Sequence, residues 1–66
     1  MGSPMKYTEH DYIKAGYQAE TASIGRARAV LERIRHMMEQ EHPEDRAEAR
    51  RLVEIGKTEA RQTRRT

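Results

Sequence analysis

The side chains with the most chemistry in this 66-residue chain are its histidines, carboxylates and hydroxyls, and their spacing shows whether they can form a site. His10, His36 and His42 are separated by 26 and 6 residues. A helix presents two metal ligands on one side only when they lie three or four residues apart. The chain has no cysteine, so thiolate ligands and disulfides are excluded. We therefore expect no metal site and no cofactor.

The carboxylates are dispersed, and each lies near an arginine or lysine at helical spacing. Glu54 precedes Lys57 by three residues, and Arg35 precedes Glu39 by four. Such pairs contribute about 0.2–0.5 kcal/mol and are typical of a solvated helix surface. Ser23 has no histidine near it in the sequence. The pattern lacks a nucleophile with a base and predicts that the protein is not an enzyme.

Basic residues form the second set with chemical potential. Five of them recur at steps of 4, 7, 4 and 3, which places them on one side of a helix, and we call them the basic strip: Arg46, Arg50, Lys57, Arg61 and Arg64. Such a strip can follow the phosphates of a nucleic acid or steer an acidic protein partner. The favoured interpretation is a solvated face neutralised by acidic residues on the same helix, because the net charge of the chain is only +2.

The three tyrosines, Tyr7, Tyr12 and Tyr17, are the third set. Tyrosine is enriched at binding hot spots because it combines a large rigid ring with a polar tip. Tyr7 and Tyr12 also flank Thr8 at the positions of a hydrophobic staple, which is a purely structural role. For Tyr12 and Tyr17, the core and the binding surface are equally good predictions.

The elements that carry these residues are predicted to be helical. Thr8 and Asp11 have the spacing of a capping box, and no proline follows before Pro43, so we expect one long helix over about residues 9–41. Its apolar stripe alternates steps of four and three with one polar member, Glu20: Ile13, Tyr17, Glu20, Ile24, Ala27, Leu31, Ile34 and Met38. This period is typical of a helix that packs along its whole length.

Pro43 is predicted to end the first helix and to begin a second one over about residues 43–62. The second helix has an apolar side made of small and aliphatic residues: Ala49, Leu52, Val53, Ile55, Gly56 and Ala60. Because the connecting turn is short, we expect an antiparallel two-helix hairpin. Gly16 is expected to mark a close approach of another backbone, and the Gly56/Ala60 edge permits one.

Helix lengths then predict the assembly. At 1.5 Å per residue the first helix is about 50 Å long and the second about 30 Å, so the N-terminal end of the first is left uncovered. We expect two hairpins to bury these overhangs as a homodimer with a four-helix arrangement. The predicted partner or dimer interface follows the stripe and the small residues beside it: Tyr12, Ile13, Gly16, Tyr17, Ala19, Ile24, Leu31, Ile34 and Met38.

The chain is expected to contain a single all-α domain over residues 5–66, with residues 1–4 an expression-tag remnant and 63–66 frayed. No apolar run approaches the ~20 residues of a membrane span, and there is no secretory leader, so we expect a cytoplasmic protein with no membrane partner.

We predict a small non-enzymatic module that binds a larger protein as a regulator or inhibitor. In size and helical plan alone it resembles plasmid- and phage-encoded regulators, which would imply a phage or other mobile-element origin and assigns no residue. The alternative is a nucleic-acid-binding hairpin dimer that uses the basic strip. A third prediction is a structural domain of a larger assembly.

Overall fold

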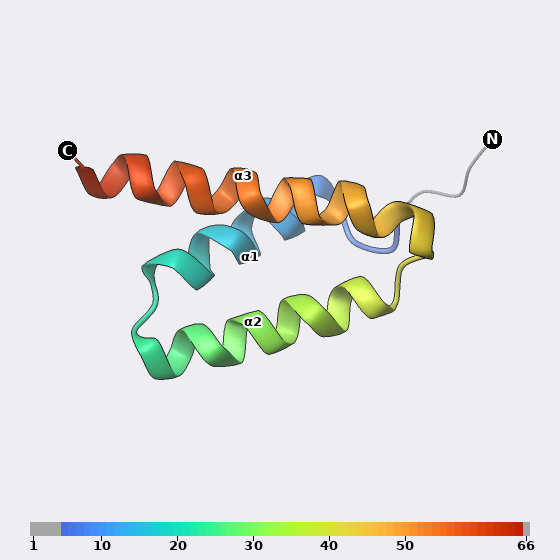
Figure 1. The fold of residues 1–66 in the computed structure, drawn as a ribbon, viewed down its shortest axis with the longest axis horizontal. Helices are drawn as coiled ribbons and strands as arrows, with labels where there is room; N and C mark the ends of the chain where they lie inside the picture. Colours follow the sequence, from blue (N-terminus) through green and yellow to red (C-terminus); the bar gives the residue numbers. More distant parts are fainter. Residues whose placement is uncertain (1–4, 66) are drawn as a thin grey trace.

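The computed structural model describes residues 5–65, and the side chains of residues 5–63. This part of the chain contains three α-helices and one 3-10 turn: α1 (Glu9–Thr21), α2 (Ile24–Glu39), η1 (Pro43–Asp45) and α3 (Arg46–Arg65). The all-α prediction is confirmed. Figure 1 shows that α1 and α3 run in the same direction, whereas α2 returns in the opposite one. Residues 1–4, predicted to be a tag remnant, and Thr66 lie outside the described residues.

The predicted single helix over residues 9–41 is wrong, because the chain breaks between Thr21 and Ile24. Ala22 and Ser23 are extended there, with ψ angles of 158° and 162°. Serine is favoured at the N-cap that begins a new helix, and threonine and serine are weak helix formers. The break therefore costs little locally, and it lets α2 fold back along the bundle.

The chain is consequently a three-helix unit and not a two-helix hairpin. It extends 42 × 23 × 14 Å along its principal axes. Most interhelical contact is between α1 and α3, less is between α1 and α2, and α2 touches α3 least. Pro43 does begin the last helical segment, as predicted, because it occupies the first turn of η1. The helix of α3 continues through Arg65, so the predicted fraying from residue 63 does not occur in residues 63–65.

The start of α1 follows the sequence prediction closely. The Thr8 hydroxyl accepts the N–H of Asp11 at 3.1 Å, and the Asp11 carboxylate accepts the N–H of Thr8 at 3.0 Å, which completes the capping box. The rings of Tyr7 and Tyr12 meet edge to face with centroids 6.0 Å apart. The predicted staple is thus present, and it fixes the angle at which the chain enters α1.

Two glycines allow α1 and α3 to pack backbone against backbone. A Cβ on Gly16 would collide with the main chain of Val53, and a Cβ on Gly56 would collide with the main chain of Ile13 and Tyr17. The predicted close approach at Gly16 is confirmed, and Gly56 is its counterpart on α3. Glycine is needed at both positions because no other residue lets the two helix axes come this near.

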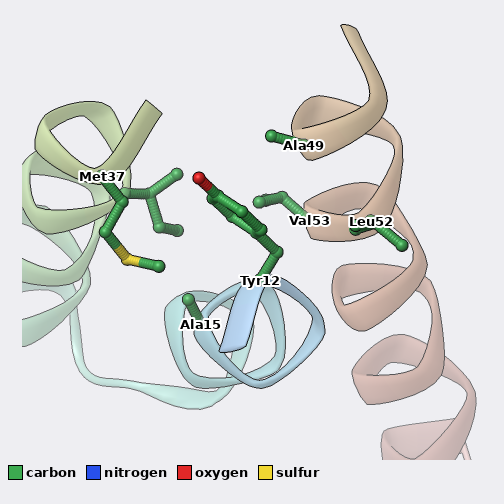
Figure 2. Packing of buried hydrophobic residues seen from close by; sticks show 7 residues of the cluster. Tyr12, Ala15, Met37, Ala49, Leu52 and Val53 are labelled. Carbon is green, nitrogen blue, oxygen red and sulfur yellow. The ribbon is translucent and has the colours of Figure 1, made fainter. Parts of the chain in front are cut away.

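All three helices contribute to the core. Figure 2 shows Tyr12 reaching between Met37 of α2 and Ala49 and Val53 of α3. The buried cluster consists of Tyr12 and Ala15 from α1, Ile34 and Met37 from α2, and Ala49, Leu52 and Val53 from α3. The apolar stripe of the sequence therefore serves different surfaces, because the break at residues 22 and 23 rotates its second half relative to its first.

Candidate binding surfaces

The first half of α2 carries the large apolar side chains that the described residues leave most open to solvent. Ile24 is 92% exposed and Leu31 is 46% exposed. They lie seven residues apart and so share one side of the helix, with the half-buried Ala27 between them. We call these three residues the α2 face. An isolated exposed aliphatic residue is ordinary, but two in register on an otherwise charged helix mark a surface suited to a partner.

The predicted uncovered end of the first helix is not observed. Tyr12 is fully buried, and Gly16 is buried with it against α3. The other members of that predicted surface, Ile13, Tyr17 and Ala19, are half-buried. The correction has a simple cause: α1 is short because of the break, so the 20-residue α3 covers it, and α2 becomes the element with apolar surface left over. The interface role of these residues stays a prediction, although the Tyr12 ring is not accessible to one.

Glu41 is a functional side chain that the sequence did not single out. It is only 5% exposed, and its carboxylate accepts three hydrogen bonds. The donors are the backbone N–H of Lys6 at 2.8 Å, the backbone N–H of Tyr7 at 3.1 Å and the hydroxyl of Tyr12 at 2.6 Å. No sequence signal could have found this cluster, because its members are 29 to 35 residues apart.

The protonation states of this cluster follow from its geometry. Burial acts to raise the pKa of Glu41, but the hydrogen bonds from Tyr12, Lys6 and Tyr7 together outweigh it, so the pKa lies below its ordinary value. Burial raises the pKa of Tyr12, and the bond to the Glu41 carboxylate raises it further. At neutral pH, Glu41 is ionised and Tyr12 keeps its proton. The cluster ties the N-terminal segment to the end of α2.

The basic strip does not form one continuous free surface. Arg46 donates from Nε to the carbonyl oxygen of Met38 at 3.1 Å and from Nη2 to that of Glu39 at 3.4 Å. It thus caps the C-terminal end of α2, where a helix favours positive charge. Arg50 is exposed and has no hydrogen bond or ion pair with a described residue. The side chain of Arg64 lies outside the described part of the chain.

The remaining two members of the strip are paired. Lys57 Nζ lies 3.4 Å from a carboxylate oxygen of Glu54. Arg61 donates from Nε to Glu20 at 3.2 Å and so links α3 to α1. This second pair explains the one polar member of the apolar stripe. Because three of its four described members are committed within the chain, the strip matches the salt-bridged interpretation better than a phosphate-binding one.

A groove runs between α1 and α2, on the flank of α2 away from Ile24. Its main part holds about 870 Å³ and is lined by Asp11, Lys14 and Gln18 from α1 and by Glu32, Arg33 and His36 from α2, among others. A second part of about 400 Å³ shares Gln18 and Arg33 and extends to Arg26. The two parts together form an open channel with polar rims, which we call the α1–α2 groove.

Metal and membrane sites were tested on the same described residues. Among them, no group of three or more His, Asp, Glu or Cys side chains is placed to hold a metal ion. The histidine with a carboxylate nearby, His36, has its Nδ1 3.9 Å from Glu39, an ordinary contact within one helical turn. No helix in this part of the chain is long and apolar enough to cross a membrane.

Comparison with known protein families, curated proteins and solved structures finds no match for this chain. The fold and its surfaces define an all-α protein of three short helices with an exposed aliphatic face and a charged groove on opposite flanks of α2. Its function is therefore argued from the chemistry of these two surfaces.

Proposed function

We propose that this chain is a small non-enzymatic interaction module that binds a larger protein through the α2 face. The observation that supports it is the 92% exposure of Ile24, two helical turns from the half-exposed Leu31. Full burial of such a side chain contributes about 1.5–3 kcal/mol. Two aliphatic anchors of this kind are enough to form the centre of a small interface.

The charge around the α2 face favours a partner that is acidic. From Ile24 to Leu31 the helix carries Arg26 and Arg28 and no acidic residue. Arg28 lies four residues after Ile24 and three before Leu31, so it stands on the same side of the helix. Neither arginine is paired with a described residue.

This charge also bears on the homodimer predicted from the sequence. A second copy docked on the same face by two-fold symmetry would bring Arg28 close to its own counterpart. Like charges facing each other across an interface oppose association. A different protein with aliphatic residues flanked by carboxylates fits the face better. Self-association through another surface stays a prediction.

The non-enzymatic part of the proposal is supported by the use of the perturbed ionisable groups. Backbone hydrogen bonding to Thr8 lowers the pKa of Asp11 within the capping box. The hydrogen bond from Arg51 lowers the pKa of Glu48, its neighbour on α3. With Glu41 and Tyr12, these groups serve local structure. Cytoplasmic location, a regulatory or inhibitory role and a mobile-element origin stay predictions from the sequence.

Nucleic-acid binding through the basic strip also stays a prediction, and it has less support. A strip that follows phosphates needs several free cations in a row. Here Arg46, Lys57 and Arg61 have partners within the chain.

The proposal is tested with the double variant Ile24→Ser/Leu31→Ser. Both positions are exposed, so we expect an unchanged helical circular dichroism spectrum and a similar unfolding temperature. The wild-type chain, immobilised at a terminus, is used to isolate a protein partner, and its affinity is then measured with purified components. We expect the double variant to bind at least tenfold more weakly, since two apolar anchors are lost.

The matched control is Ala29→Ser, an exposed change on another side of the same helix, and it should keep the wild-type affinity. Light scattering over a dilution series runs in parallel. A folded double variant with undiminished affinity would refute the role of the α2 face. A wild-type dimer that the same double variant abolishes would mean that the face serves self-association instead.

A further inference from the structure

The α1–α2 groove is a surface distinct from the α2 face. Arg33 follows Ile24 by nine residues, which at 100° per residue places it half a turn away. The groove holds about 870 Å³ in its main part and about 400 Å³ in its extension. A ligand in this groove therefore leaves Ile24 free, and the inference below does not depend on the proposed function.

Cations line the groove from both helices. Lys14 projects from α1, and Arg33 and Arg26 project from α2. The two arginines are exposed and have no hydrogen bond or ion pair with a described residue. They lie seven residues apart, so their backbones are about 10.5 Å apart along the helix. The groove thus offers two unpaired guanidinium groups at a fixed spacing.

The carboxylates of the groove do not neutralise these arginines. Asp11 is held by the N–H of Thr8 in the capping box at 3.0 Å. Glu32 stands 3.9 Å from Arg35, which lies outside the groove. Counting the three cations above against these two acids leaves a net charge of +1, with both acids already engaged. An anionic ligand would meet attraction at the arginines and little competition.

The remaining wall of the groove consists of small and apolar side chains. Ala15 and Ala29 face the main part together with Met37, and Val30 lines the extension. The aromatic side chain at the groove, Tyr7, already packs edge to face on Tyr12 and is not a free stacking platform. Single-stranded nucleic acids need such platforms for their bases. The wall suits the short side chains of a peptide better.

We propose that the α1–α2 groove binds an extended acidic peptide segment whose carboxylates pair with Arg26 and Arg33. Arginine binds carboxylates through two parallel hydrogen bonds, which gives the contact direction as well as charge. An extended chain rises about 3.3 Å per residue, so the 10.5 Å between the arginines corresponds to about three residues. Small residues between the two acids would lie against Ala15 and Ala29.

The test measures fluorescence anisotropy of a labelled peptide of Glu-Ala-Ala repeats with the full chain at low salt. The groove variant Arg26→Glu/Arg33→Glu reverses the two proposed contacts. Its matched control, Arg28→Glu/Arg50→Glu, changes the net charge equally at two exposed, unpaired arginines outside the groove. We expect the groove variant to lose at least about tenfold in affinity and the control to lose less than about threefold.

Further arms separate the alternatives. The softer variant Arg33→Gln, checked for folding by circular dichroism, should also weaken peptide binding. The variant Ile24→Ser/Leu31→Ser should keep the wild-type affinity for the peptide, so this result is independent of the outcome for the α2 face. Equal losses in the groove variant and its control would overturn the proposal, as would absence of binding at millimolar peptide. Tighter binding of an oligothymidylate of equal charge, lost in the groove variant, would assign the groove to nucleic acid and also overturn it.

Discussion

A single methyl group at Gly56 is expected to separate α1 from α3. A Cβ at this position would fall inside the carbonyl oxygen of Ile13 and lie 2.9 Å both from the Ile13 carbonyl carbon and from the Tyr17 nitrogen. These are main-chain atoms of a helix and cannot rotate aside as a side chain does. In the variant Gly56→Ala the two helices must move apart, and the contact between Gly16 and Val53 opens with them.

The magnitude is a difference of two effects. Alanine is a better helix former than glycine and stabilises a helix interior by about 0.5–1 kcal/mol. Overpacking in a close-packed contact costs about 1–3 kcal/mol, and the upper value applies where backbone must move. We therefore expect Gly56→Ala to lower the free energy of unfolding by about 2 kcal/mol. For a chain of this size that corresponds to a fall in unfolding temperature of about 8–16 °C.

Gly25 supplies the matched control, because a Cβ added there meets nothing within 4 Å. Gly25→Ala should therefore show the helix propensity alone and raise the free energy of unfolding by up to about 1 kcal/mol. Both variants are measured by thermal and urea unfolding, followed by far-ultraviolet circular dichroism. If Gly56→Ala were as stable as Gly25→Ala, the close crossing of α1 and α3 would be refuted.

Two further predictions concern polar contacts that join distant parts of the chain. Replacing Glu41 by Gln turns a charged acceptor of three hydrogen bonds into a neutral amide, so the free energy of unfolding should fall by about 1.5–3 kcal/mol at neutral pH. Because folding lowers the pKa of Glu41, its contribution is complete above the unfolded pKa and is lost as pH falls through the folded pKa; urea titrations from neutral to acid pH should show a shallower pH dependence in Glu41→Gln than in the wild type. Arg46→Met keeps the apolar stem and removes the donors to the end of α2, which should cost about 0.5–1.5 kcal/mol in urea unfolding. An unchanged midpoint would show that this cap contributes nothing to stability.

Features that depend on neighbouring residues were predicted correctly. The capping box of Thr8 and Asp11 and the start of the last helical segment at Pro43 are both present. Gly16 lies at a close approach of backbones, as its small neighbours indicated. These features act within one or two helical turns, or on one side of a helix, so the local sequence contains the information needed to predict them.

The break at Ala22 and Ser23 was not predicted, because the apolar stripe runs through it without a change of step. Threonine, serine and glycine around the break are weak helix formers, but each costs at most about 1 kcal/mol. Whether the helix continues or breaks depends on what α1 gains by packing on α3, and that gain comes from residues more than 30 positions away. The exposure of Ile24 follows from the break and was invisible for the same reason.

The sequence by itself determined where helices begin and which of their residues are apolar, since caps, proline and helical period act locally. Only the tertiary structure decided that α1 would be covered and the first half of α2 left open. It also decided that Glu41 would collect its hydrogen bonds from Lys6, Tyr7 and Tyr12. The physical reason is that these outcomes depend on which of several similar apolar faces pack together, and that choice rests on shape complementarity between distant segments, above all at Gly16 and Gly56.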